Sequence, residues 1–129
     1  MDAMGWLDRF RGGAVPGVRM SEVLQRLAAG AVLVDVRSLA EYERGHAPGS
    51  KHVDANSLTG SRDAMLDAVF GDDPLANRDA PLIIMAAVLP QAGQAVMRLQ
   101  TAGIDARPLV GGLTAWVRDG QPLVPGPPR

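Results

Sequence analysis

The sequence predicts an α/β protein in which helices cover both faces of a parallel β-sheet. Short, continuous apolar runs, of which residues 82–86 are the strongest, are typical of strands that are buried on both sides. These runs alternate along the chain with segments whose apolar residues recur at helical spacing, as in strand–helix–strand units. Such sheets bind ligands beyond the carboxyl ends of their strands, so the loop after Met85 is the expected place for a site.

The individual elements follow from the same patterns. The expected strands cover residues 31–36, 51–53, 82–86 and 106–110. The expected helices cover residues 21–29, 38–44 and 58–70, a stretch around residues 95–102, and the segment from Gly112 to Gly120. Ser21 is the predicted N-cap of the first helix, and Ser38 and Glu41 have the spacing of a capping box.

The composition limits the classes of function. The chain has 129 residues, which suits one domain with its own core. Its net charge of -1 favours neither nucleic acid nor an anionic membrane as a partner. It contains no cysteine, which excludes disulfides, thiolate metal sites and thiol nucleophiles. No run approaches the ~20 apolar residues of a membrane helix and no secretory signal is visible, so we expect a soluble, cytoplasmic protein.

We predict three segments: an N-terminal arm over residues 1–17, a domain over residues 18–124, and a proline-rich C-terminal tail over residues 125–129. The chain from Pro122 onward is expected to be extended or disordered. Within the arm, Leu7 and Phe10 are spaced for one helical face, which predicts a short helix packed on the domain. An arm that binds a membrane surface or a partner is the alternative.

Three motifs carry a resemblance to a known family. Asp35-Val36-Arg37 follows a predicted strand, residues 41–49 read Glu-Tyr-Glu-Arg-Gly-His-Ala-Pro-Gly, and residues 111–116 read Gly-Gly-Leu-Thr-Ala-Trp. Together they resemble rhodanese-like domains, a sulfurtransferase family that carries sulfur as a cysteine persulfide. The resemblance spans roughly residues 20–124. It implies a three-layer fold with a central five-stranded parallel sheet, and an active loop between the fourth strand and the next helix.

In the resembling family, that loop opens with the nucleophilic cysteine. Backbone N–H groups and the dipole of the following helix stabilise its thiolate. Alignment from the strand at residues 82–85 and from the helix that ends at Gly103 both place Ala86 at the cysteine position. The whole active-site-loop equivalent is Ala86, Ala87, Val88, Leu89, Pro90 and Gln91.

This loop differs from the family pattern along its whole length. Ala87 and Gln91 stand where basic residues often occur, and Val88 and Leu89 replace a small, glycine-bearing turn. Pro90 removes one backbone N–H donor. A single engineered cysteine-to-alanine substitution would leave the other positions polar, so we interpret the loop as an inherited loss of sulfur transfer.

The other motif residues are predicted to be structural. Asp35 and Arg37 are expected to pair at the end of a strand, and His46 to brace its turn by hydrogen bonds. Tyr42 is expected to pack with its hydroxyl at the rim of the domain. The remaining structural predictions are a helix cap at Glu41, a turn at Gly111 and Gly112, a core position for Trp116, and a surface or packing role for His52.

Two hypotheses about function remain open. In the first, the chain is a non-catalytic binding or regulatory module that contacts a protein partner through residues 86–91, since an exposed apolar patch often marks an interface. In the second, it binds a small anion at the helix after the loop, or hydrolyses a substrate with a bound water. A persulfide carrier is excluded by Ala86. We expect no cofactor, no nucleic acid and no integral membrane segment, and the two histidines are too few for a metal site.

Overall fold

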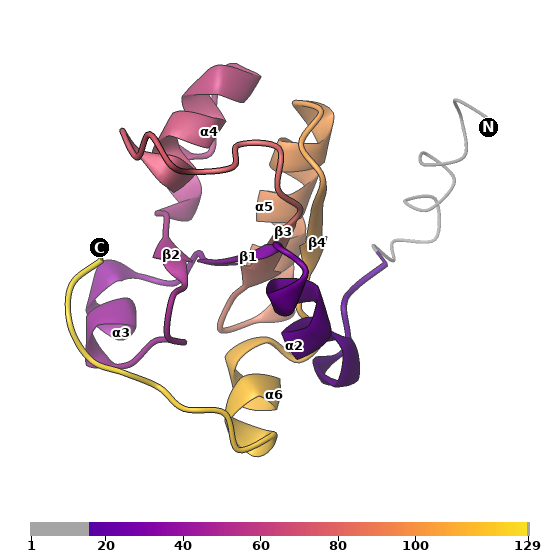
Figure 1. Cartoon of the computed structure of the whole chain (residues 1–129), viewed down its shortest axis with the longest axis vertical. Coiled ribbons are helices and arrows are strands. Elements are labelled where there is room, and N and C mark those ends of the chain that lie inside the picture. Colours follow the sequence, from indigo (N-terminus) through magenta and orange to yellow (C-terminus); the bar gives the residue numbers. More distant parts are fainter. Residues whose placement is uncertain (1–15, 129) are drawn as a thin grey trace.

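The computed structural model describes residues 16–128, which form an α/β fold around one parallel sheet (Figure 1). The strands are β1 (Val32–Asp35), β2 (Lys51–His52), β3 (Leu82–Met85) and β4 (Ala106–Pro108), in the order β2-β1-β3-β4. All neighbouring strands are parallel. The predicted fold class is therefore confirmed, and each expected apolar run contains a strand.

Within residues 16–128 the sheet has four strands, not the five that the family resemblance implied. A single parallel bridge between Val18 and Leu109 stands beyond β4 instead. The amide of Val18 donates to Pro108 O at 2.8 Å, and the amide of Val110 donates to Val18 O at 2.9 Å. Pro16 carries no N–H, and the chain enters a helix at Met20, so this edge pairs through one residue only.

Helices lie on both sides of the sheet, which gives the three predicted layers (Figure 1). The helices are α2 (Met20–Ala28), α3 (Leu39–Arg44), α4 (Arg62–Phe70), α5 (Leu89–Thr101) and α6 (Gly112–Arg118), with a 3-10 turn at Ala55–Ser57. Alternate residues of β3 face opposite layers. Leu82 and Ile84 pack in the cluster that contains α4 and α5 residues, whereas Ile83 and Met85 pack with residues of α2 and α6.

Several predicted helix boundaries are wrong. The N-cap of α2 is Arg19, which has no capping side chain, so Ser21 lies inside the first turn. α4 begins at Arg62 rather than at residue 58, because the side chain of Ser61 accepts a hydrogen bond from the amide of Ala64 and so caps the helix there. The capping box at Ser38 is present, since its hydroxyl oxygen accepts from the amide of Glu41 at 3.2 Å.

The tail runs back over the domain in an extended conformation. It leaves α6 and passes along α3, as the yellow trace in Figure 1 shows. Val124 forms an antiparallel bridge with His46. The predicted N-terminal arm lies outside the described residues, apart from Pro16 and Gly17. Within the described part of the chain, no helix is long and apolar enough to cross a membrane.

Candidate functional site

The predicted active-site-loop equivalent lies at the carboxyl end of β3. Ala86 follows the strand directly, is 2% exposed, and belongs to the core cluster on the α4 and α5 side of the sheet. The next residues turn outward: Ala87 and Pro90 are exposed, and Val88 is 60% exposed. The side chain of Leu89 lies outside what the structure describes. The segment therefore combines a buried methyl group at the nucleophile position with an apolar surface beside it.

Helix α5 begins inside this segment. Its N-cap is Val88, which provides no side-chain cap, and Pro90 lies in its first turn. Proline fits there because the first amides of a helix have no partner within the helix. The segment predicted as a loop therefore contains only Ala86, Ala87 and Val88 outside the helix, and Gln91 is a helical residue.

Contacts from both neighbouring elements hold the segment in place. The amide of Val36, just after β1, donates to Met85 O at 3.0 Å. The side-chain amide of Gln91 donates to Val36 O at 3.2 Å. On the other side, the amide of Leu113 in α6 donates to Ala86 O at 3.3 Å. Hydrogen bonds to the carbonyl oxygens of Met85, Val36 and Ala86 thus join this region to the end of β1 and to α6.

Gly112 makes the contact with α6 possible. It has a φ of +52°, and a Cβ atom added there would collide with the carbonyl oxygen of Ala86. The preceding Gly111 has a left-handed conformation and is the N-cap of α6. The glycine pair predicted as a turn therefore also brings the start of α6 against the nucleophile position.

The chemistry of this segment differs from that of a sulfur carrier. Ala86 has no group that can attack or hold sulfur. Neither Ala87 nor Gln91 carries the positive charge that would attract an anionic substrate. Pro90 offers no backbone donor at the start of α5. The residues that the segment exposes to solvent include Ala87, Val88 and Pro90, all of them apolar.

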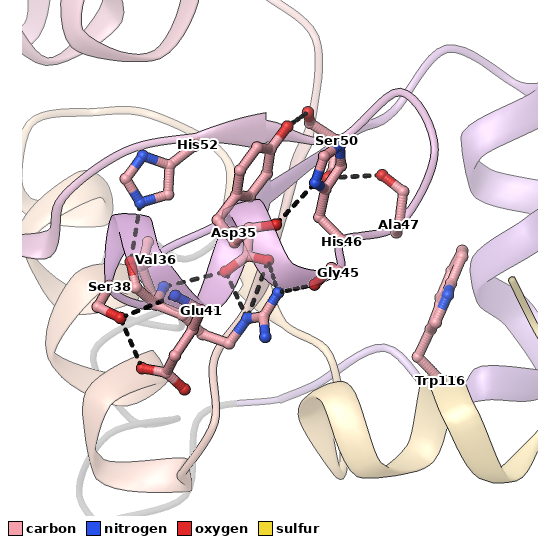
Figure 2. A network of polar contacts seen from close by, with 12 residues as sticks. Asp35, Val36, Ser38, Glu41, Gly45, His46, Ala47, Ser50, His52 and Trp116 are labelled. Carbon is pink, nitrogen blue, oxygen red and sulfur yellow. Dashed lines mark hydrogen bonds and ion pairs between the residues drawn. The ribbon is translucent and has the colours of Figure 1, made fainter. Parts of the chain in front are cut away.

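Asp35 and Arg37 form a buried ion pair at the end of β1, and Figure 2 labels Asp35 with its dashed contacts. Their side chains are 0% and 4% exposed, and Arg37 Nη2 lies 2.8 Å from Asp35 Oδ2. Arg37 Nε donates to both carboxylate oxygens at 3.0 Å. Arg37 Nη2 also donates to Gly45 O at 2.7 Å, which ties β1 to the end of α3. The expected pair is therefore present, and every contact it makes is internal.

Hydrogen bonds join Tyr42 to Ser50 and to His46 in a second polar group, in which Figure 2 labels His46 and Ser50. The Tyr42 ring is stacked on the imidazole of His46, with centroids 3.8 Å apart. Its hydroxyl donates to Ser50 O at 2.8 Å, and the residue is 1% exposed. The expectation that this hydroxyl lies at the rim is therefore wrong. His46 Nδ1 lies 2.8 Å from Tyr42 O, so the histidine braces the turn as predicted.

The other predicted residues have structural contacts. His52 Nε2 lies 2.8 Å from Arg37 O, and Glu41 Oε1 accepts from the Ser38 hydroxyl at 2.9 Å. Trp116 is 3% exposed, and its indole N–H donates to Pro122 O at 2.9 Å. Among residues 16–128, no group of three or more histidine, aspartate or glutamate side chains is arranged to hold a metal ion.

Sequence reasoning missed two features of this region. The amide of Gln91 crosses from α5 to Val36, a pairing between residues that are distant in the sequence. The tail also lies against the turn that contains His46, where it helps to form a pocket. Neither contact has a local sequence signal, because each depends on how separate elements pack.

Comparisons with known proteins agree with this fold. A family model described as "Rhodanese-like domain" matches residues 19–119. The HTH-type transcriptional regulator Rv0324 of Mycobacterium tuberculosis is 31% identical over 118 residues, which are 91% of this chain. The chain spans only 48% of the length of that curated relative.

Solved structures of the same kind show the fold. The Alr3790 protein from Anabaena sp. is 23% identical with a TM-score of 0.66, covering 84% of this chain and 81% of that one. The human single-domain sulfurtransferase TSTD1 is 24% identical with a TM-score of 0.64, covering 81% and 97% respectively. With the matching family model, these similarities lead to one conclusion: the chain belongs to the rhodanese-like domain family.

Proposed function

We propose that this chain is a non-catalytic rhodanese-like module that binds a protein partner through residues 86–91. The observation that carries the proposal is the alanine at the nucleophile position, in a chain without any cysteine. Ala86 is packed into the core, so its side chain offers neither a nucleophile nor a polar contact to a substrate. A rhodanese scaffold with this segment cannot carry sulfur as a persulfide.

The surface beside Ala86 supports the choice of a protein as the ligand. Val88 is 60% exposed, and Pro90 is exposed next to it. Leu39, at the start of α3 beyond the carboxyl end of β1, is 48% exposed. Because β1 and β3 are paired neighbours, Leu39 and Val88 both follow strand ends at the same edge of the sheet. Exposed apolar side chains gathered at one edge are typical of an interaction surface.

The curated relative supports a regulatory partner. Its name describes an HTH-type transcriptional regulator, and this chain corresponds to 48% of its length. We propose that the module acts together with a DNA-binding domain of the helix-turn-helix class. The net charge of -1 supports contact with that protein rather than with DNA itself. A regulatory partner of this class also favours a cytoplasmic location.

The alternative, a small anion bound at the start of α5, has less support. A helix N-terminus attracts anions through its unpaired amides. Here Val88 provides no capping side chain, Pro90 removes one donor, and residues 86–91 contain no arginine or lysine. The same absences weaken any mechanism in which a bound water would attack a substrate at this position.

Site-specific photo-crosslinking in cells tests the proposed surface. A photoreactive phenylalanine analogue at position 88 is compared with the same analogue at position 75. Leu75 is 91% exposed and lies in the connection that leads to the amino end of β3, so it serves as the matched control. We expect a crosslink to a helix-turn-helix protein from position 88 and none from position 75.

A second variant connects the crosslink to the apolar surface. In the chain that carries the analogue at position 88, Leu39→Asp places a charge where the proposed interface is apolar. It should weaken recovery of the crosslinked protein by about tenfold or more. The same crosslinks from positions 88 and 75, or unchanged recovery with Leu39→Asp, would contradict the proposal.

A further inference from the structure

A pocket lies between the turn at residues 45–50 and the C-terminal tail. Its volume is about 430 Å³, and it is lined by Tyr42, His46, residues 48–51 and residues 124–127. No residue of the 86–91 segment lines it, so it is separate from the proposed protein-binding surface. A volume of this size falls within the range of small-molecule sites.

The tail forms a fixed wall of this pocket. Val124 N donates to His46 O at 2.8 Å, and His46 N donates to Val124 O at 3.0 Å. Gly126 N donates to Glu43 O at 2.9 Å. The indole of Trp116 donates to Pro122 O, where the tail leaves α6. These bonds hold both sides of the pocket before any ligand arrives, which lowers the entropic cost of binding.

The hydrogen bonds of His46 determine what its second nitrogen can do. Nδ1 lies 2.8 Å from Tyr42 O, and a carbonyl oxygen can only accept, so Nδ1 carries the hydrogen. In the neutral ring, Nε2 is then an acceptor. Within residues 16–128, Nε2 makes no hydrogen bond. Every buried side-chain polar atom in these residues has a hydrogen-bond partner, so Nε2 is not fully buried and has some contact with solvent. The stack on Tyr42 fixes the plane of the ring.

Lys51 is among the residues that line the pocket, and it is the only lysine of the chain. Among residues 16–128, no aspartate or glutamate lines the pocket. The hydroxyls of Tyr42 and Ser50 donate to Ser50 O and Ala47 O, at 2.8 Å and 2.7 Å, so neither donor is available to a ligand. The described lining therefore combines a lysine, the imidazole of His46 and several prolines.

We propose that this pocket binds a small organic monocarboxylate that carries a hydroxyl or N–H group. The carboxylate pairs with the Lys51 ammonium, and the hydroxyl or N–H donates to His46 Nε2. The carbon skeleton rests on Pro48, Pro125 and Pro127. Lys51 is the one lysine or arginine among the lining residues that the structure describes, and one positive charge matches a monoanion better than a phosphate dianion.

Titration with three matched probes tests this assignment by NMR. Lactate carries both groups, propionate lacks only the hydroxyl, and lactamide lacks only the charge. We expect saturable shifts of the amide resonances of residues 49–51, Val124 and Gly126 with lactate. Propionate should bind about 2- to 10-fold more weakly, the worth of one hydrogen bond, and lactamide about tenfold more weakly.

Two charge variants separate the pocket from a general effect of net charge. Lys51→Met should weaken lactate binding by about tenfold, and its amide spectrum reports whether the fold is intact. Arg118→Met removes one positive charge from an exposed site outside the pocket and should leave binding unchanged. Equal affinities for lactate and propionate, equal effects of both variants, or no saturable shift up to about 50 mM lactate would overturn the assignment.

Discussion

Asp35 and Arg37 belong to one of the family motifs, and their buried ion pair has a structural role inside the domain. Both side chains are almost completely buried, and the guanidinium satisfies the carboxylate and Gly45 O together. Burying two charges is costly, and good geometry with additional hydrogen bonds offsets much of that cost. The spacing Asp-x-Arg after a strand predicted this pair, because both residues are local to the strand end. The bond to Gly45 O has no such signal.

Replacement of Arg37 should expose the cost of an unpaired buried charge. Arg37→Met leaves Asp35 without its partner, and we expect the free energy of unfolding to fall by about 3–5 kcal/mol. Chemical denaturation measures this change. The double variant Asp35→Leu with Arg37→Met removes both charges and should be less destabilised than Arg37→Met alone. A loss below about 1 kcal/mol for the single variant would show that the pair contributes little.

At the scale of elements, local signals predicted more than contacts between elements. The capping box at Ser38 was predictable because its partner is three residues away. The start of α5 was not, since Pro90 is compatible with both a loop and the first turn of a helix. The composition of the tail predicted that it is extended. It did not predict that Val124 pairs with His46, because these residues are far apart in the sequence.

Two glycine substitutions test how α6 meets the segment after β3. Gly112→Ala adds a methyl group against the carbonyl of Ala86 at a φ of +52°, and should destabilise the fold by about 1–3 kcal/mol or more. Gly93→Ala is the matched control, because Gly93 lies within α5 and an added Cβ meets no atom within 4 Å. It should stabilise the protein by about 0.5–1 kcal/mol.

Thermal and chemical unfolding of both glycine variants provide the comparison. Opposite signs are expected, because the same methyl group is added to a crowded, left-handed position in one case and to an open helical position in the other. A neutral Gly112→Ala variant would contradict the close approach between α6 and Ala86.

For the whole molecule, the apolar strand pattern was sufficient to predict the fold class. Strands β1 and β3 are buried on both faces, as their continuous apolar runs indicated. The five strands that we expected from the family resemblance are too many for the described residues, in which the sheet has four. Residues 86–91 follow β3 at its carboxyl end, as expected, while their role as a site stays a prediction. The burial of Ala86 and the contacts of the segment with β1 and α6 depend on packing.

Thiosulfate-to-cyanide sulfur transfer is the most direct test of the claim that this scaffold is not a sulfur carrier. The assay compares the unaltered chain with Ala86→Cys, and thiocyanate is measured against a protein-free background. We expect no thiocyanate above background from the unaltered chain. Ala86→Cys should also stay near background, because the segment contains no arginine and Pro90 lacks one of the amide donors that would stabilise a thiolate. Thiocyanate formation in proportion to the concentration of the unaltered chain would contradict the account.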